Sequence, residues 1–349
     1  MKSYHLYVGT YGQHIHVLSY DEKTGEIAPD SKIEAMDASY IALNGSSLHA
    51  VSERGGDSGV HTFYMTKEGW IPGAMFHEVG ADPCFILSID GKQVVTADYS
   101  GGSFSLFDIA DGFISKRAQC EHFQTIYDGN PPVPGRQDTA HIHQVREIPA
   151  SICGDAGRFF LASDLGNDLI RVLRYSASRL EQVSVIECGT GSGPRHMEFN
   201  EDASMLYCIT ELSGELIGWR ISTESGIPQF MEVQRLVADQ CDAHGSADIH
   251  LHPNGRWLYT SHRLQGDGSS VFNVMADGLV EKVGYRLTGK HPRNFTFSPD
   301  GRKMLVACRD TQSIEVYDLD AENGMLSEGF SSFILDEDRP VCLVFEQND

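Results

Sequence analysis

Two stretches of the chain share one pattern, IHLHPNGRWLYTS at residues 249–261 and FTFSPDGRKMLVA at residues 295–307. Each contains an alternating apolar and polar run, a turn with Pro, Asn or Asp and Gly, and a second apolar run. Asn-Gly and Asp-Gly tolerate the positive φ angles that tight hairpin turns require. Each stretch therefore predicts a β-hairpin.

Weaker copies of the same hairpin recur along the chain. With the two copies above, the turns are centred near residues 45, 91, 157, 202, 255 and 301, at intervals of 46, 66, 45, 53 and 46 residues. A repeat of about 40–50 residues built from strands alone is typical of the blades of a β-propeller. The widest interval predicts an inserted loop at residues 128–140, which is rich in proline.

The two ends of the chain predict a seventh blade. Residues 341–345 (VCLVF) form an apolar strand that no partner follows, and residues 5–10 (HLYVGT) resemble the second strand of a blade. Pairing both ends in one sheet would remove the open edge that a ring otherwise exposes. We therefore expect an all-β chain that forms a single seven-bladed β-propeller domain over residues 1–349.

The composition agrees with this fold and argues against some classes of binding partner. The 35 glycines are a tenth of the chain, against about 7% in typical proteins, and no long stretch shows the apolar spacing of a helix. A net charge of −22 argues against binding to nucleic acid or an anionic membrane. The sequence shows neither a signal-peptide core nor an apolar run of about 18 residues that could span a membrane, so we expect a cytoplasmic protein. We also expect a monomer or weak homo-oligomer.

The eight cysteines are scattered and form no CxxC pair. Several lie within apolar strand runs, where a reduced cysteine packs like a small hydrophobic residue. We expect reduced packing residues rather than disulfides or a zinc site.

Polar residues at the strand ends predict a site at one mouth of the propeller channel. Residues just before the first strand of a blade and at the end of its second strand share a face. The pairs that this predicts, each separated by 16 residues, are Asp82 with Asp98, Arg195 with Glu211 and Arg293 with Arg309. The predicted ring contains His143, Asp164, Arg195, His196, Glu211, His262, Arg263, Arg293 and Arg309. Four arginines suit a small anionic substrate, and Glu211 and His143 are available for proton transfer.

Simpler interpretations of the same residues exist. Arg195 and Glu211 could form a structural salt bridge and nothing more. His141 and His143 have the two-residue spacing of metal ligands, but so many arginines would repel a cation, so we expect neither a metal nor another cofactor.

Eight short segments, taken in order, carry a family resemblance. They are YVGTY at 7–11, RQ at 136–137, HIHQ at 141–144, DLGND at 164–168, GPRH at 193–196, TEL at 210–212, SHR at 261–263 and HPRNF at 291–295. Over nearly its whole length the chain resembles the seven-bladed propeller lactonases, the group that contains bacterial 6-phosphogluconolactonase and fungal carboxymuconate-lactonizing enzymes. The resemblance implies hydrolysis of a sugar lactone, in the pentose phosphate route if the substrate carries phosphate, or the related ring-forming chemistry on a muconate.

The resemblance also implies roles for particular residues. In the lactonizing branch the catalytic constellation is a His, an Arg, a Glu and a second Arg, and the matching positions are His143, Arg195, Glu211 and Arg263. The remaining expected substrate-binding residues are His141, Asp164, His196, His262, Arg293 and Arg309. The sequence departs from the family at Ile142, where proline or alanine is usual, at the turn 201–203, which lacks its glycine, and at Asn254, which replaces an aspartate.

These residues favour lactone hydrolysis without a metal. Glu211 or His143 would take a proton from the attacking water, while Arg195 and Arg263 stabilise the oxyanion. Arg293 or Arg309 could then hold a distal phosphate or carboxylate. Two alternatives remain: a cycloisomerase that protonates a muconate carbon, and a propeller without catalytic activity that binds other proteins.

Overall fold

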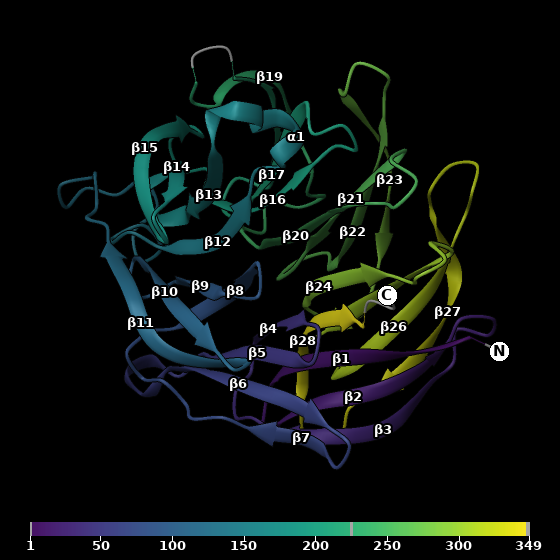
Figure 1. Cartoon of the computed structure of the whole chain (residues 1–349). Helices are drawn as coiled ribbons and strands as arrows, with labels where there is room; N and C mark the ends of the chain where they lie inside the picture. Colours follow the sequence, from purple (N-terminus) through teal and green to yellow (C-terminus); the bar gives the residue numbers. More distant parts are fainter. Residues whose placement is uncertain (1, 224–225, 347–349) are drawn as a thin grey trace. The chain divides into compact units, whose positions relative to one another are not determined.

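The computed structural model describes residues 2–223 and 226–346, and almost all of its regular elements are strands (Figure 1). The strands form seven sheets of four strands each, which are the sheets that seven propeller blades require. Besides strands, the described residues form only short helical turns: η1 (Gly55–Asp57), α1 (Ala150–Cys153), η2 (Gly154–Ala156) and η3 (Leu165–Asn167). No helix of the described residues is long and apolar enough to cross a membrane.

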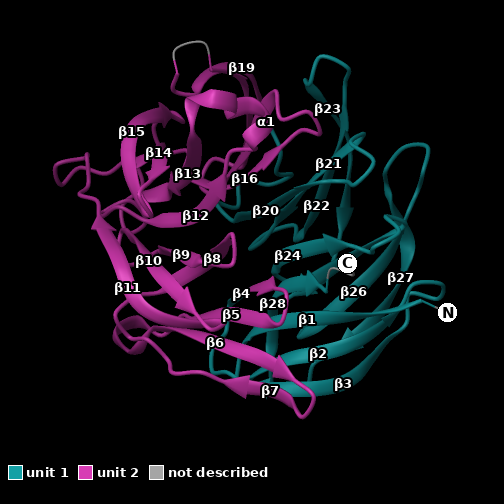
Figure 2. Cartoon of the chain, viewed as in Figure 1, with its two compact units in different colours: residues 1–41, 237–349 teal, residues 42–236 magenta. Residues whose placement is uncertain are grey.

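The chain divides into two compact units, residues 1–41 with 237–349 as unit 1 and residues 42–236 as unit 2 (Figure 2). The expectation of a single domain stays a prediction, and each unit is described below by itself. Residues 123–141, which include the predicted insertion at 128–140, contain no strand and are called the inserted loop below.

Unit 1 contains three of the sheets. The first has the order β28-β1-β2-β3, and the others are β20-β21-β22-β23 and β24-β25-β26-β27 (Figure 1). Their strands are β1 (Ser3–Tyr11), β2 (His14–Asp21), β3 (Ile27–Glu34), β20 (Ser246–Leu251), β21 (Trp257–His262), β22 (Gly268–Val274), β23 (Val280–Leu287), β24 (Pro292–Phe297), β25 (Lys303–Cys308), β26 (Ser313–Leu319), β27 (Leu326–Ile334) and β28 (Arg339–Phe345).

The first of these sheets joins the two ends of the chain. Strand β28 pairs antiparallel with β1, with Tyr7 opposite Val344 and Val8 opposite Leu343. Because β1 also pairs with β2, the last strand of the chain and the first hairpin form one sheet. The predicted pairing of the two ends in one blade is confirmed.

Unit 2 contains the other four sheets, whose strands follow one another in sequence. The strands are β4 (Tyr40–Asn44), β5 (Ser47–Ser52), β6 (Gly59–Thr66), β7 (Gly69–Pro72), β8 (Pro83–Ile89), β9 (Gln93–Asp98), β10 (Ser103–Ala110), β11 (Phe113–His122), β12 (Ile142–Glu147), β13 (Arg158–Asp164), β14 (Leu169–Ser176), β15 (Arg179–Glu187), β16 (Pro194–Phe199), β17 (Met205–Thr210), β18 (Glu215–Ser222) and β19 (Gln229–Val237).

All six predicted hairpins join the first two strands of a sheet. In the turns of the two clearest copies, Gly255 and Gly301 adopt φ angles of 70° and 69°. Each donates its backbone N–H to the residue three positions earlier, His252 and Ser298, so the turn spans four residues. The positive φ that the sequence predicts therefore falls on the glycine alone.

The hydrophobic core lies between neighbouring sheets of a unit. In unit 2, Phe159 and Leu161 of β13 belong to one buried cluster with Leu206 of β17 and Trp219 of β18. The second strands β17 and β21 are buried along their whole length, whereas the fourth strands β19 and β23 are mostly exposed. Polar residues at the ends of the inner strands are thus held by rigid, buried backbone.

Candidate active site

Irregularities at the start of the first strands position several of the predicted site residues. In β12, β16 and β24 one extra residue interrupts the pairing with the second strand, and these residues are His143, Arg195 and Arg293. A β-bulge leaves its extra residue outside the ladder and re-aims the side chain, which is why bulges recur beside active sites. Because each of these three sheets has a bulge at the same place, the three predicted residues occupy equivalent positions in their sheets.

In unit 2 the bulged Arg195 forms the predicted pair with Glu211. Its Nε donates to Oε2 of Glu211 at 2.8 Å, and the two residues are only 1% and 6% exposed. Glu211 directly follows β17, where it shares the end of the hairpin with Arg195. Ser163 of the adjacent sheet donates its hydroxyl to the Arg195 carbonyl at 2.6 Å, so the bulged backbone is held in place.

A second arginine, which the sequence analysis did not select, reaches the same carboxylate. Arg136 of the inserted loop donates to Oε1 of Glu211 at 2.5 Å and lies 3.4 Å from the hydroxyl of Tyr99. Burial lowers the pKa of Arg136, but Glu211 and Tyr99 outweigh it and raise the pKa above its ordinary value, so the guanidinium stays charged. Glu211 thus lies between two guanidinium groups.

Tyr99 was also missed, although a signal for it existed. It directly follows β9, as Glu211 follows β17, so it occupies the equivalent position in its own sheet. The sequence analysis paired Asp82 with Asp98 in that hairpin. Asp98 instead lies inside the sheet, fully buried, and accepts hydrogen bonds from Ser103 and Ser105.

Two histidines of unit 2 contact the Tyr99 ring, and a third histidine contacts one of these two. His141 stacks on Tyr99 with ring centroids 4.2 Å apart, and His143 meets the ring edge-on at 5.6 Å. His196 lies 5.2 Å from His143. His143 and His196 are 4% and 3% exposed, so a deep group of imidazoles lies within the same unit as the arginine and glutamate.

Asp164 is brought to this region, but its carboxylate holds protein groups together. It is fully buried, and its Oδ2 accepts from both Nε and NH2 of Arg171 at 3.0 and 2.6 Å. Its Oδ1 accepts from the backbone N–H of His141 at 2.9 Å. This arrangement fits a positioning role for Asp164.

Asp168, at the end of the DLGND segment, anchors the inserted loop. It accepts hydrogen bonds from Gln137 and Tyr127 of the loop and from the backbone of Gly191 and Gly193. The same carboxylate therefore fixes the loop that carries Arg136 and the approach to Arg195.

Unit 1 contains the other four predicted site residues, and three of these four are arginines. Arg263, 4% exposed, donates Nε to the Gly245 carbonyl at 2.8 Å, and its NH1 lies 3.3 Å from Nε2 of His291. Arg293 lies over the Tyr11 ring at 5.4 Å. Arg309 binds the neighbouring Asp310, with Nε 2.7 Å from Oδ1.

His262 differs from these arginines because it lies inside its sheet. It is fully buried, with Nδ1 2.8 Å from the Ser246 hydroxyl and Nε2 2.8 Å from the Thr260 hydroxyl. Burial, with smaller contributions from Lys282 and Arg263, lowers the pKa of His262 to about 3, so the ring is neutral. These contacts fit a structural histidine.

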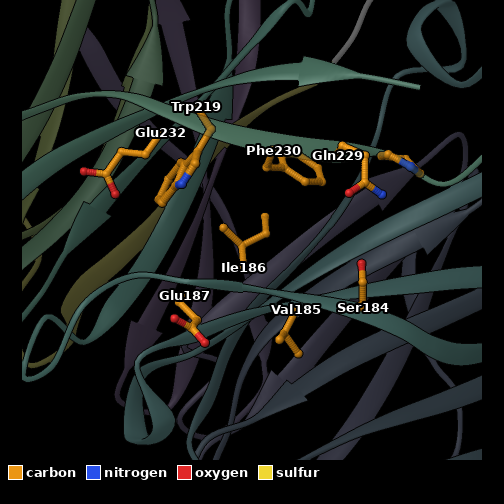
Figure 3. A pocket seen from close by; sticks show the side chains of 9 residues that line it. Ser184, Val185, Ile186, Glu187, Trp219, Gln229, Phe230 and Glu232 are labelled. Carbon is orange, nitrogen blue, oxygen red and sulfur yellow. The ribbon is translucent and has the colours of Figure 1, made fainter. Parts of the chain in front are cut away.

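Two surface pockets of unit 2 lie away from these residues. One, of about 330 Å³, is lined by residues of β15, β18 and β19 with the segment before β19, among them Ile186, Trp219 and Phe230 (Figure 3). The other, of about 470 Å³, is lined by residues of β11, β14 and β15 and the turn before β15, including Gln119 and Leu180. Neither is lined by a predicted site residue.

Comparison with known proteins gives the same family over nearly the whole chain. Residues 5–345 match the family described as Lactonase, 7-bladed beta-propeller. The chain is 29% identical to a 6-phosphogluconolactonase of Formosa agariphila over 93% of this chain and 94% of that protein, and 26% identical to the 6-phosphogluconolactonase of Bacillus subtilis over 99% of both.

Solved structures agree with the sequence comparison. A protein from Bacteroides fragilis is 35% identical, with a TM-score of 0.89 over 99% of this chain and 98% of that one. The periplasmic gluconolactonase of Pseudomonas aeruginosa is 26% identical, with a TM-score of 0.86 over 99% of both chains. The predicted seven-bladed propeller is confirmed, and the chain belongs to the seven-bladed β-propeller lactonase family.

Proposed function

We propose that this protein is a lactonase that hydrolyses a sugar lactone, with 6-phosphogluconolactone as the substrate and 6-phosphogluconate as the product. Family membership and the two curated relatives of that name support the reaction class. The observation that carries the proposal is the arrangement Arg136–Glu211–Arg195 in unit 2, in the same unit as His143 and His196. Such a group of cations and imidazoles suits an anionic ester.

His143 is the residue that we assign as the general base. Both oxygens of Glu211 accept from guanidinium groups, so Glu211 is suited to orient Arg195 and Arg136. The His143 ring, edge-on to both Tyr99 and His196, is held in one orientation by its neighbours. Histidine is the side chain that most often acts as a general base, and a carboxylate that binds two cations has little capacity left to take a proton.

The reaction then runs in two steps. His143 takes a proton from water as the oxygen attacks the lactone carbonyl carbon, and Arg195 donates to the oxygen that becomes negatively charged. The carbon–oxygen bond of the ring then breaks, and the imidazolium returns the proton to the ring oxygen. The products are the open-chain hydroxyl and the carboxylic acid, which ionises in water.

Arg136 is the residue of this group that we assign to first contact with the substrate. Its side chain is 35% exposed, whereas those of Arg195 and Glu211 are 1% and 8% exposed. A guanidinium binds phosphate or carboxylate through two parallel hydrogen bonds. The arginines of unit 1, Arg263, Arg293 and Arg309, keep their predicted roles in oxyanion stabilisation and anion binding as part of this proposal.

The proposal places the protein in the cytoplasm, in the pentose phosphate route, acting without a metal or nucleic-acid partner. The substrate of that route is phosphorylated and is produced inside the cell, and the net charge of −22 disfavours nucleic acid. Cell fractionation of the native host checks the location. Recovery of the protein in the periplasm, the location named for the Pseudomonas aeruginosa relative, would contradict it.

The decisive experiment follows acid release from freshly prepared 6-phosphogluconolactone and from gluconolactone. The wild type should exceed the spontaneous rate, and His143→Gln should lower kcat by about 10²–10⁴-fold, the usual contribution of a general base. His61→Gln is the matched control, because His61 lies in the same unit and bonds only the Gly73 carbonyl among its described hydrogen bonds.

Three outcomes would contradict the proposal. If the wild type does not accelerate hydrolysis, the protein is not a lactonase for these substrates. If His143→Gln and His61→Gln hydrolyse the lactone at equal rates, His143 is not the general base. Conversion of a carboxymuconate into its lactone, detected by product analysis, would instead support the cycloisomerase.

A further inference from the structure

Two histidines and an aspartate converge in the sheet that joins the chain ends. Nδ1 of His14 and Nε2 of His16 lie 3.1 and 2.7 Å from the same oxygen, Oδ2 of Asp338. Within residues 2–223 and 226–346, these form the only group of three His, Cys, Asp or Glu residues found with all potential ligand atoms within 4.8 Å. None of them belongs to the predicted lactonase site.

The strand pairing explains why these residues meet. His14 and His16 are two positions apart on β2, so their side chains leave the same face of the sheet. Asp338 directly precedes β28, and β28 pairs with β1, the neighbour of β2. Residues more than 300 positions apart in sequence are thereby brought onto one surface.

The backbone around the aspartate fixes its carboxylate. The N–H of Gln13 donates to Oδ1 of Asp338 at 2.8 Å, so Oδ1 is anchored while Oδ2 faces the imidazoles. A Cβ at Gly12 would lie 1.9 Å from Oδ1, so only glycine allows the carboxylate to approach this turn. Such outer hydrogen bonds are what orient the ligands of metal sites.

The chemistry and burial of the group suit a transition metal. Two imidazole nitrogens and one carboxylate oxygen are a common ligand set for Zn²⁺. Asp338 and His16 are 3% and 5% exposed, whereas the His14 side chain is 30% exposed and leaves a path for an ion and a water ligand. Lys32, opposite His16 on β3, is exposed, so water screens its charge.

We propose that His14 Nδ1, His16 Nε2 and Asp338 Oδ2 bind one divalent metal ion of the zinc type, with water completing the coordination. Ligands at about 2.0–2.1 Å from a tetrahedral ion lie about 3.3 Å apart. From their distances of 3.1 and 2.7 Å to Oδ2, His14 Nδ1 and His16 Nε2 would therefore move away from it by about 0.2 and about 0.6 Å. Each neutral ring keeps one proton, which moves from the coordinating nitrogen to the other ring nitrogen.

The ion would act as a latch between the chain ends. It would connect residues 14 and 16 to residue 338 within the sheet β28-β1-β2-β3. An unfolded chain does not hold these ligands together, so binding would stabilise the fold. The latch is separate from the proposed lactonase function and does not depend on it.

The test uses the full chain, stripped of metal with a chelator and then titrated with Zn²⁺. The wild type should bind one Zn²⁺ per chain by calorimetry, and the metal should raise its Tm. His14→Gln and Asp338→Asn should bind at least tenfold more weakly and lose the Tm increase. Asp336→Asn is the matched control: it removes an exposed carboxylate from the same loop and should behave as the wild type.

Other readouts separate the latch from weak surface binding. Co²⁺ in the wild type should give the visible absorption of a low-coordinate site, and His14→Gln, at the most exposed ligand, should lose it even if Asp338→Asn fails to fold. Absence of stoichiometric Zn²⁺ binding in the wild type would overturn the proposal, as would equal binding by Asp338→Asn and Asp336→Asn. Loss of lactone hydrolysis on chelation, restored by Zn²⁺, would overturn its separation from the active site.

Discussion

Two hairpins with the same sequence signature end in different environments. The hairpin β16–β17 carries Pro194-Arg195 and Glu211, and β24–β25 carries Pro292-Arg293 and Arg309, with the same bulge after the proline. In the first, the arginine and its partner form a buried ion pair; in the second, Arg293 lies on Tyr11 and Arg309 turns to Asp310. The repeat thus fixes the backbone position of each side chain, whereas the residues around that side chain decide the direction in which it points.

The largest difference between the two hairpins should appear in catalysis, when the arginine at the bulge of each is replaced by alanine. Arg195→Ala should lower kcat for lactone hydrolysis by about 10²–10³-fold, because it removes a donor to the developing oxyanion. Arg293→Ala, which removes a partly exposed side chain, should raise KM by no more than about tenfold. Steady-state kinetics with the spontaneous rate subtracted measure both, and a greater loss in Arg293→Ala would reverse the comparison.

The two ion pairs should differ in their effect on stability. Glu211→Gln leaves Arg195 buried without its counter-charge and should destabilise the fold by about 3 kcal/mol. Asp310→Asn breaks a pair whose acid is 41% exposed and should cost no more than about 1 kcal/mol. Urea unfolding of both variants at pH 7 checks this difference, and similar midpoints would show that burial does not separate the pairs.

His262, the last residue of β21, should affect the stability of the fold rather than catalysis. Its pKa is lowered to about 3 by burial, so below about pH 6.5 the unfolded chain binds a proton that the folded chain does not. The His262 contribution to stability is therefore complete above pH 6.5 and declines as the pH falls toward 3, by on the order of 2 kcal/mol at pH 5.

His262→Gln should remove that part of the pH dependence. The variant and the wild type are compared by urea unfolding at several pH values between 4 and 7, on the order of one pH unit apart. The pH profile of kcat should stay that of the wild type, and a changed profile would place His262 in the chemistry instead.

The loop arginine should act on substrate binding. Arg136→Ala should raise KM by about tenfold and leave kcat within about threefold, because Arg195 still holds Glu211. Arg117→Ala, another partly exposed arginine of unit 2, is the control and should leave KM unchanged. A fall in kcat with constant KM would mean that Arg136 acts in the transition state only.

The smallest effect concerns the turns of the same two hairpins. Gly301 has φ 69°, and its counterpart Ala203 has φ 57°, a conformation that costs alanine about 1 kcal/mol. Gly301→Ala should therefore destabilise by about 1 kcal/mol, whereas Ala203→Gly should change stability by less than about 0.5 kcal/mol, because relief of strain offsets loss of a buried methyl group. Thermal unfolding measures both, and equal shifts would contradict the account.

By itself the sequence determined the repeat, the seven blades, the sheet that joins the ends and the pair Arg195–Glu211. These depend on local patterns, namely alternation, turn residues and a constant spacing, which act over a few residues. The lactone as the substrate class was implied by the family resemblance and not by these local patterns. The same patterns also marked Asp164 and His262, whose polar atoms bind other protein groups in the structure, because spacing does not show which partners a side chain contacts.

Only the tertiary structure decided which groups meet. Arg136 reaches Glu211 from a loop 75 residues away in sequence, and Asp338 reaches His14 and His16 from the far end of the chain. The hairpin β8–β9 is also one residue shorter than β16–β17, because Pro83 pairs with Asp98 across 15 residues and Pro194 with Thr210 across 16, so Tyr99 rather than Asp98 corresponds to Glu211. Such contacts follow from strand register and loop anchoring, which depend on interactions across the fold and leave no local sequence pattern.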